Sequence, residues 1–503
     1  MGYTGQANYR NAEPRGTDVM TDFFLSNFVT IITVINIPLA IAVMFLERRN
    51  VGVTWAWLMV LLFLPAVGFV VYLVFGQNLS KKKLYKLNRR TRETMNALIE
   101  QQRREFRDHR IVFNDDAAER YSDLICMNLT SGFALYTQNN HVDIFTNGPD
   151  KFDALFADIE RATHHIHLMY YIVHNDGLGR RLVDALTEKA KQGVKVRFLV
   201  DDIGSSLLKR EFFGELVKAG GEVAYFFPSK IPYLNIRVNY RNHRKLVIID
   251  GQIGYIGGFN VGDEYMGLNK RFGFWRDTHL RITGYAVLQM QAHYMMDWNL
   301  ASHTTFSREV LGLFPPAAIT GTTGIQIVSS GPDQTLEQIK NAYIKMIHSA
   351  KQSIYMQTPY FIPDESLLNA LKLAVLSGID VRIMLPSRPD HKMVYWATFS
   401  YLGELLEEGM KCYLYEKGFL HAKALVVDGT VASVGTANVD IRSFKLNFEI
   451  NAILYDTKTA MELKRIFEED MLDCTELTYE QYQRRSRLER FRESCVRLLS
   501  PIL

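Results

Sequence analysis

The chain has 503 residues, of which 48% are hydrophobic and 22% are charged, and its formal net charge is only +4. This length allows two or three domain cores, and the composition excludes disordered and low-complexity proteins. The four cysteines lie far apart without a Cys-x-x-Cys pair. This spacing argues against a disulfide framework or a zinc site and favours a reducing compartment.

Two long apolar segments near the N-terminus predict a membrane hairpin within residues 1–79. They run over about residues 23–46 and 51–75 and are separated by a short charged loop. At about 1.5 Å per residue, each helix would reach roughly 36 Å, enough for a hydrocarbon core of about 30 Å. A cleaved signal peptide is the alternative. The length of the first segment and the acidic Asp22 before it disfavour that reading.

The basic residues around the two segments predict their orientation. Seven lysines and arginines follow the second segment between residues 81 and 92, whereas the loop carries only Arg48 and Arg49. Because basic residues accumulate on the cytoplasmic side, we expect a multi-pass protein of the cell membrane with its bulk in the cytoplasm. Residues 80–139 read as a basic, helical connector.

The rest of the chain is an internal duplication. The segment "FTNGPDKFDALFADIERATHHIHLMYYI" (residues 145–172) matches "VSSGPDQTLEQIKNAYIKMIHSAKQSIYMQTPYFI" (residues 328–362) in outline, with a Gly-Pro turn, an amphipathic helix and an apolar strand. Strands that alternate with helices predict α/β halves with buried sheets. We place these halves at residues 140–314 and 325–503, joined by a linker rich in glycine and threonine.

Each half carries the same polar motif at the same spacing. The first copy lies in "NHRKLVIIDGQIGYIGGFN" and the second in "LHAKALVVDGTVASVGTAN", 178 residues later. The shared positions are His243, Lys245, Asp250 and Asn260 in the first copy, and His421, Lys423, Asp428 and Asn438 in the second. On a strand, residues two apart point to the same face, so each histidine and lysine should project together. A single copy could be an ordinary strand with exposed polar groups, but two matched copies disfavour that interpretation.

These groups suit an anionic tetrahedral centre. Lysine and asparagine can hold non-bridging oxygens, and histidine can act as nucleophile or proton donor near neutral pH. Two facing copies would supply an acid–base pair that neither half has alone. The sequence shows no metal-binding motif and no cofactor motif, and we expect none to be needed, because the two lysines can neutralise the charge. Thr436, before Asn438, is a further candidate phosphate contact.

The constellation resembles the phospholipase D superfamily, whose H-x-K-x4-D signature occurs twice in monomeric members. The resemblance covers roughly residues 140–503 and implies two similar α/β halves around one site, a covalent phosphohistidine and no metal. It also implies a carboxylate that orients each histidine, for which Asp277 in "FWRDTHL" and Glu449 in "LNFEINA" stand at the expected places. Gly258 departs from the pattern, because many members have a hydroxyl residue there.

Within the superfamily, the layout is similar to that of bacterial cardiolipin synthases. The segments "YIGGFNVGDEYMG", "FLHAKALVVDG" and "VGTANVDIRSFKLNFE", the ending "LLSPIL" and the N-terminal hairpin carry this likeness. It implies transfer of phosphatidyl from one phosphatidylglycerol to another with release of glycerol. A phospholipase D-type hydrolase or another phosphatidyltransferase is the alternative. A nuclease is disfavoured by the membrane segments, and an inactive scaffold by the two complete motifs.

The C-terminal segment predicts a contact with anionic lipids. "QRRSRLERFRESCVRLLSPIL" combines six arginines with an apolar stripe formed by Leu488, Phe491, Cys495, Leu498 and Leu499. This pattern is typical of a helix lying on an anionic leaflet, and a helix packed against the protein with a solvated basic face is the alternative. We expect no nucleic acid partner, and whether the protein forms a homo-oligomer stays open.

Overall fold

The computed structural model describes residues 27, 30, 34, 36–45, 51–64, 68, 72, 84–85, 89–228, 239–304, 310–316 and 318–500. They divide into two compact units, residues 1–78 and residues 79–503. The second unit holds both copies of the polar motif.

In the first unit, helix α2 (Val51–Phe63) lies against a helical stretch at residues 36–45. The Nδ2 of Asn36 donates to the carbonyl oxygen of Leu61 at 2.8 Å, and Val43, Leu61 and Tyr72 form a small buried cluster. Most of the other large apolar side chains are exposed. None of the helices in the described part of the chain combines the length and the hydropathy of a membrane span. Both predicted spans lie partly outside the described residues.

The second unit is built on one continuous mixed sheet to which both halves contribute equivalent strands in the same order. Strands of the first half follow the order β1-β9-β7-β6-β2-β3-β4, and those of the second half the order β10-β19-β17-β16-β11-β13-β14, with β20 at the edge. The first-half strands are β1 (Thr137–Phe145), β2 (His165–Tyr170), β3 (Lys195–Asp201), β4 (Glu222–Phe226), β6 (Leu246–Ile249), β7 (Ile253–Gly257) and β9 (His279–Thr283). The second-half strands are β10 (Thr323–Ser330), β11 (Ser353–Gln357), β13 (Asp380–Pro386), β14 (Lys411–Tyr415), β16 (Ala424–Val427), β17 (Val431–Gly435), β19 (Asn447–Tyr455) and β20 (Cys474–Leu477).

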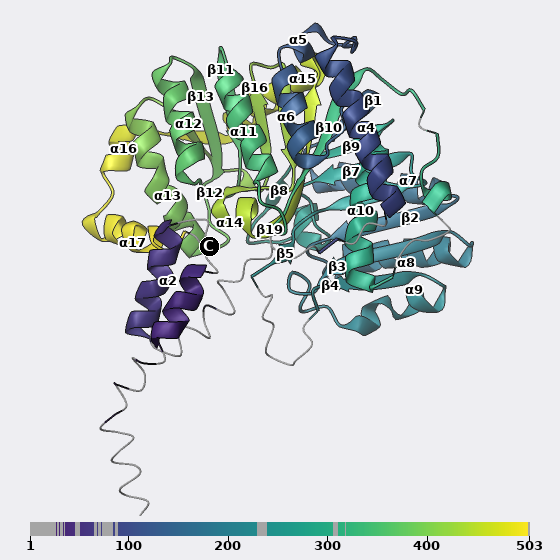
Figure 1. Cartoon of the computed structure of the whole chain (residues 1–503), viewed down its shortest axis with the longest axis horizontal. Helices are drawn as coiled ribbons and strands as arrows, with labels where there is room; N and C mark the ends of the chain where they lie inside the picture. Colours follow the sequence, from purple (N-terminus) through teal and green to yellow (C-terminus); the bar gives the residue numbers. More distant parts are fainter. Residues whose placement is uncertain are drawn as a thin grey trace, which may run out of the picture. The chain divides into compact units, whose positions relative to one another are not determined.

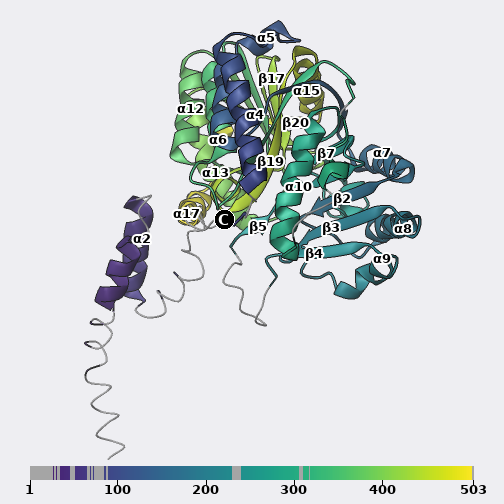
Figure 2. The same cartoon turned by 45° about the vertical axis from the view of Figure 1, so that its right-hand side comes forward.

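The two halves lie side by side because β1 pairs antiparallel with β10 (Figure 1). Helices α7 (Gly148–Arg161), α8 (Gly177–Lys191) and α9 (Gly214–Lys218) run along one side of β2, β3 and β4, and α10 (Ala286–Ser302) along the other (Figure 2). The corresponding helices of the second half are α11 (Gln338–Ser349), α12 (Glu365–Leu376), α13 (Lys392–Glu407) and α15 (Thr457–Asp470). Apolar layers on both faces explain why strands such as β6 and β16 are entirely buried.

The helices start where the sequence provides caps. Asn147 accepts a hydrogen bond from the backbone N–H of Asp150 at the start of α7, with Pro149 in the first turn. Asp364 caps α12 in the same way through the N–H of Leu367. Each cap satisfies a backbone donor that the helix itself leaves unpaired, and so determines where the chain turns from strand to helix.

The basic connector packs against the second half, although it precedes the first half in the chain. Its helices are α4 (Arg89–Arg107), α5 (Asp116–Glu119) and α6 (Ser122–Gly132). Ile99, Phe106 and Leu124 share a buried core with Ile339 and Met346 of α11. Figure 1 shows α4 and α6, in dark blue, beside the green α11 and β10. The connector therefore completes the core of the second half.

At the C-terminus, α16 (Tyr479–Gln483) and α17 (Arg487–Arg497) pack against α13. Val496 and Glu493 are buried there, and the Arg497 guanidinium lies 2.7 Å from the Glu404 carboxylate. The opposite face stays in solvent, with Leu488 56% and Phe491 66% exposed. The helix thus packs on the protein through one face and presents its predicted apolar stripe on the other.

Candidate active site

Two short parallel strand pairs cross from one half to the other and bring the motifs together. Strand β5 (Arg241–Asn242) pairs with the start of β19, with Asn242 opposite Phe448. Strand β15 (Gly418–Leu420) pairs with β8 (Phe274–Arg276), with Leu420 opposite Arg276. Continuing each register by one residue brings His243 beside Glu449 and His421 beside Asp277. Each histidine therefore meets the carboxylate of the other half.

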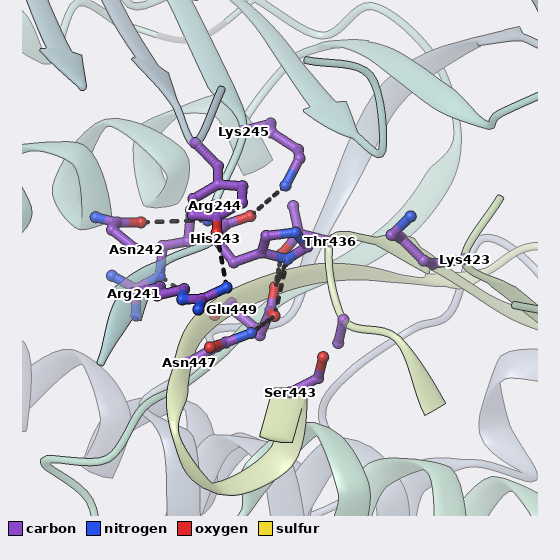
Figure 3. A network of polar contacts seen from close by, with 12 residues as sticks. Arg241, Asn242, His243, Arg244, Lys245, Lys423, Thr436, Ser443, Asn447 and Glu449 are labelled. Atoms are coloured by element: carbon purple, nitrogen blue, oxygen red, sulfur yellow. Dashed lines mark hydrogen bonds and ion pairs between the residues drawn. The ribbon is translucent and has the colours of Figure 1, made fainter. Parts of the chain in front are cut away.

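Each imidazole is hydrogen-bonded to its carboxylate through Nδ1. The Nδ1 of His243 lies 2.9 and 3.1 Å from the two carboxylate oxygens of Glu449, and the Nδ1 of His421 lies 2.7 Å from Oδ2 of Asp277. Figure 3 shows the first of these contacts within its polar network. Both carboxylates are fully buried. In the tautomer with the proton on Nδ1, each ring donates to its carboxylate and leaves Nε2 available for chemistry.

The two lysines lie close to the imidazoles and are themselves buried. The Nζ of Lys245 donates to the carbonyl oxygen of His243 at 2.7 Å, and the Nζ of Lys423 lies 3.0 Å from Nδ1 of His421. Burial lowers the pKa of Lys245 to about 7 and that of Lys423 to about 8, each partly offset by nearby carboxylates. Each histidine and lysine precedes its strand β6 or β16, rather than lying within it as the spacing suggested, because the chain is crossing to the other half there.

The histidines are held neutral in this environment. Burial, followed by the positive charge of Lys423, lowers the pKa of His421 to about 4. Burial, followed by Lys245 and Lys423, also lowers the pKa of His243 well below its usual value. A phosphate anion placed among these groups would offset the lysine charges and so raise both histidine pKa values. These surroundings therefore favour the neutral, nucleophilic form of imidazole.

The two carboxylates differ in their surroundings. Burial raises the pKa of Glu449 to about 7, and the hydroxyl of Thr436 donates to its Oε2 at 2.6 Å. Burial would also raise the pKa of Asp277, but Lys423 and His421 outweigh it and the pKa is lowered. A Cβ at Gly258, the counterpart of Thr436, would come within 2.0 Å of Oδ1 of Asp277. The missing hydroxyl of the first copy thus makes room for the aspartate.

The predicted phosphate contacts lie beside the motifs. Asn260 accepts from the N–H of Ile172 at 3.2 Å and donates to the hydroxyl of Tyr265 at 3.1 Å. The Oδ1 of Asn438 is buried without a hydrogen-bond partner among the described residues. Since the Thr436 hydroxyl is engaged by Glu449, its position supports the carboxylate rather than a phosphate.

The geometry does not support a catalytic role for Asp250 and Asp428. Their carboxylates bind backbone N–H groups at the start of strands β2 and β11. Asp250 accepts from Thr163, His164 and His165, and Asp428 from Lys351, Gln352 and Ser353, at 2.8 to 2.9 Å. They follow β6 and β16, whereas the histidines precede these strands, so a whole strand separates the two groups. Both aspartates fix the turn from helix to strand.

Two arginines stabilise the strand pairs that link the halves, and neither was predicted from the sequence. The guanidinium of Arg244 lies 2.6 Å from Oδ2 of Asp297 on α10, and its Nε donates to the carbonyl oxygen of Glu449 at 3.2 Å. The buried Arg276 forms an ion pair with the partly buried Asp470, at 2.8 Å. Only the position of each arginine, one residue from His243 or Asp277, could have indicated a role at the site. Their partners are distant in sequence and could not be identified.

Aromatic rings pack against both imidazoles. The ring centroid of Tyr171 lies 4.8 Å from that of His243, and the centroid of Trp275 lies 5.3 Å from that of His421. Neither aromatic residue is among the site residues predicted from the sequence. In the described residues, no group of three or more His, Cys, Asp or Glu is placed to hold a metal ion. The site thus consists of paired imidazoles, carboxylates and lysines.

Comparison with known proteins agrees with this site. The family model "Cardiolipin synthase, PLD-like domain" matches residues 155–279 and 343–471, once in each half, and "Phospholipase_D-nuclease N-terminal" matches residues 27–77. The chain is 52% identical over 478 residues to the major cardiolipin synthase ClsA of Bacillus subtilis. This match covers 95% of this chain and 99% of that protein. It is 51% identical over 472 residues to the cardiolipin synthase of Oceanobacillus iheyensis, covering 93% of this chain and 98% of that protein.

Among solved structures, phosphatidylserine synthase from Haemophilus influenzae superposes with a TM-score of 0.57 at 14% identity, over 72% of this chain and 95% of that one. This likeness supports the duplicated α/β fold alone. The fold and the doubled motif define a phosphatidyltransferase of the phospholipase D superfamily. The chain belongs to the bacterial cardiolipin synthases of that superfamily, as the sequence predicted.

Proposed function

We propose that the protein joins two phosphatidylglycerol molecules into cardiolipin and glycerol through a phosphohistidine intermediate. The observation that carries this proposal is the crossed pairing of His243 with Glu449 and His421 with Asp277, beside two buried lysines. One chain thereby holds two oriented imidazoles on either side of an anion-binding centre. Such a pair can divide one phosphoryl transfer into two easier steps.

In the first step, Nε2 of one histidine attacks the phosphorus of the donor lipid. The new N–P bond forms as the bond between phosphorus and the glycerol oxygen breaks, and the other histidine, protonated, gives its Nε2 proton to that oxygen. The carboxylate on Nδ1 stabilises the positive charge that develops on the attacking ring. Lys245 and Lys423 stabilise the negative charge on the non-bridging oxygens.

In the second step, the head-group hydroxyl of another phosphatidylglycerol replaces glycerol. The histidine that lost its proton takes the hydroxyl proton, the lipid oxygen forms a bond to phosphorus, and the N–P bond breaks. Both histidines return to their starting states, so the two steps form a closed cycle. Asn260 and Asn438 are positioned by the same glycine-containing turns and would hold the phosphate oxygens in both steps.

The N-terminal unit would anchor this reaction at the cell membrane. We place two spans at about residues 23–46 and 51–75, with the catalytic unit on the cytoplasmic side, because of the apolar length and the basic residues that follow. Exposed apolar side chains of the first unit, including Ile41, Trp55 and Phe63, support a lipid environment. The exposed face of α17, with Leu488 and Phe491 beside arginines, would add a contact with anionic lipids.

The experiment that tests this proposal uses purified full-length protein and vesicles of defined phosphatidylglycerol. We expect cardiolipin and glycerol to appear in equal amounts without added nucleotide. Rapid quenching of a reaction with phosphorus-labelled lipid should trap label on His243 or His421, identified by peptide mass spectrometry. Phosphatidic acid without cardiolipin would instead establish a hydrolase, and turnover without a labelled histidine would exclude the covalent mechanism.

A further inference from the structure

Two arginines from different halves, Arg241 and Arg442, lie near one another, and Arg241 also lies near His243. Arg241 is on β5, two residues before the histidine, and Arg442 is on the short helix α14 (Ile441–Lys445) that follows the second motif. Nη1 of Arg241 donates to the hydroxyl of Tyr171 at 3.0 Å. Nη2 of Arg442 donates to the carbonyl oxygen of Asn239 at 3.0 Å. Both side chains are only partly buried, so a ligand can reach them.

Their position relative to the reacting centre follows from the local backbone. Residues two apart on an extended strand project to the same face and are about 6.6 Å apart along it. Arg241 and His243 are related in this way, since β5 pairs with β19 and the N–H of His243 extends this pairing to the carbonyl oxygen of Phe448. Tyr171 links the two, because its hydroxyl binds Arg241 while its ring packs on His243.

The two guanidinium groups repel each other. Burial, followed by the charge of Arg241, lowers the pKa of Arg442 to about 10. The carboxylates of Asp201 and Asp440 act on these arginines and also accept hydrogen bonds from the backbone. Asp201 accepts from Ile203, Gly204 and Asn242, and Asp440 accepts from the N–H of Ser443. Among the described residues, no carboxylate oxygen lies within 4.0 Å of the Arg241 guanidinium. A mobile anion would therefore relieve this repulsion.

We propose that Arg241 and Arg442 form a second anion site that holds the phosphodiester of the acceptor lipid. The inference rests on the proposed function, in which the acceptor is itself a phospholipid. In the product, one glycerol separates the two phosphates. An acceptor whose phosphate binds at the arginines would place its free head-group hydroxyl near the phosphorus held by His243. The arginines therefore select a phospholipid acceptor over glycerol or water.

Asn447 is suited to position the acceptor hydroxyl. It is opposite Arg241 in the β5–β19 register, and its Nδ2 donates to Oε1 of Glu449 at 3.1 Å. Its Oδ1 is buried without a hydrogen-bond partner among the described residues. A hydroxyl that donates to this oxygen would satisfy the remaining hydrogen-bond acceptor of Asn447. It would lie between the arginines and Glu449, the carboxylate that binds His243. Figure 3 shows Arg241, Asn447 and Glu449 within one network.

The test compares two reactions of the same full-length enzyme in lipid–detergent micelles. One is cardiolipin formation, which needs a phospholipid acceptor, and the other is exchange of labelled glycerol into phosphatidylglycerol, which does not. In Arg241→Gln and Arg442→Gln, cardiolipin formation should fall about 10- to 100-fold more than exchange, the expected loss for a charge-assisted hydrogen bond. Arg241→Lys should fall in between, since lysine keeps the charge but not the planar fork.

Lys445→Gln is the matched control, because Lys445 is on the same helix, is partly exposed and, among the described residues, forms an ion pair with Glu337 alone, at 3.8 Å. This variant should leave the ratio of the two rates unchanged. An equal fall of both rates in the arginine variants would mean that these residues hold the donor or the fold, and would overturn the inference. An unchanged ratio would overturn it as well. If the wild-type enzyme makes cardiolipin but shows no exchange, the phosphatidyl-enzyme of the proposed function fails, and the acceptor site fails with it.

Discussion

The Nδ1 of His243 lies 2.9 Å from Oε1 of Glu449, a residue 206 positions later in the chain and in the other half of the molecule. His421 and Asp277 form the reciprocal pair. Neither half therefore contains a complete imidazole–carboxylate unit, although each contains a full copy of the motif. The duplication produces one shared site rather than two separate sites.

The crossed pairs predict that both carboxylates are needed for full turnover, although each is distant in sequence from the histidine that it binds. Glu449→Gln and Asp277→Asn should each lower turnover about 10²- to 10⁴-fold, because each imidazole loses the group that fixes its Nδ1 proton and its developing charge. The measurement is the rate of cardiolipin formation from phosphatidylglycerol vesicles. Combining Glu449→Gln with His243→Ala should add little to the loss in His243→Ala alone, since the two act as a unit. Additive losses would mean that they act separately.

The charge of Lys423 predicts the direction in which a histidine pKa will move. A positive charge beside His421 disfavours the imidazolium, so replacing it in Lys423→Met should raise the pKa of His421 from about 4 towards its usual value. Burial remains, so the rise should be incomplete. Titration of the His421 ring by NMR measures this shift. Lys245→Met should raise it less, because Lys245 is a weaker cause of the shift. An unchanged or lower pKa in Lys423→Met would contradict the electrostatic account.

The two motif aspartates should prove structural. Asp250→Ala removes the acceptor for three backbone N–H groups and should reduce the free energy of unfolding by about 2 kcal/mol, as for a hydrogen-bonded charged group. Asp428→Ala should cost a similar amount. Thermal denaturation with activity measured well below the transition separates stability from catalysis. If the folded fraction of either variant loses activity as fully as His243→Ala does, the aspartate takes part in the reaction after all.

The N-terminal unit should decide how well water is excluded. Phosphatidyl on a histidine can pass to a lipid hydroxyl or to water, and anchoring the site at the head-group layer would favour the lipid. Deleting residues 1–76 should give a folded enzyme that cleaves lipid in detergent but makes more phosphatidic acid relative to cardiolipin. The ratio of these products at equal lipid is the measurement. If it does not change, the pocket alone excludes water and the N-terminal unit serves only as a tether.

The sequence by itself determined the duplication and the family, and it predicted which groups react. The two copies of His-x-Lys are patterns of neighbouring residues. Such patterns can be recognised in the sequence without knowledge of the tertiary structure. One family model matches both halves, so the predictions of the duplication and of the family are confirmed. The roles of individual site residues remain predictions.

Only the tertiary structure decided which groups act together. The pairing of His243 with Glu449 depends on the register of β5 on β19, and the burial of Arg244 against Asp297 depends on helix α10. Asp250 belongs to the repeated motif by its spacing from His243, yet its carboxylate accepts a backbone hydrogen bond at the start of β2. Sequence spacing records distance along the chain, whereas hydrogen bonds and charge interactions depend on distance in space. The four residues of β6 therefore separate Asp250 from the candidate active site, although Asp250 belongs to the same sequence motif as His243.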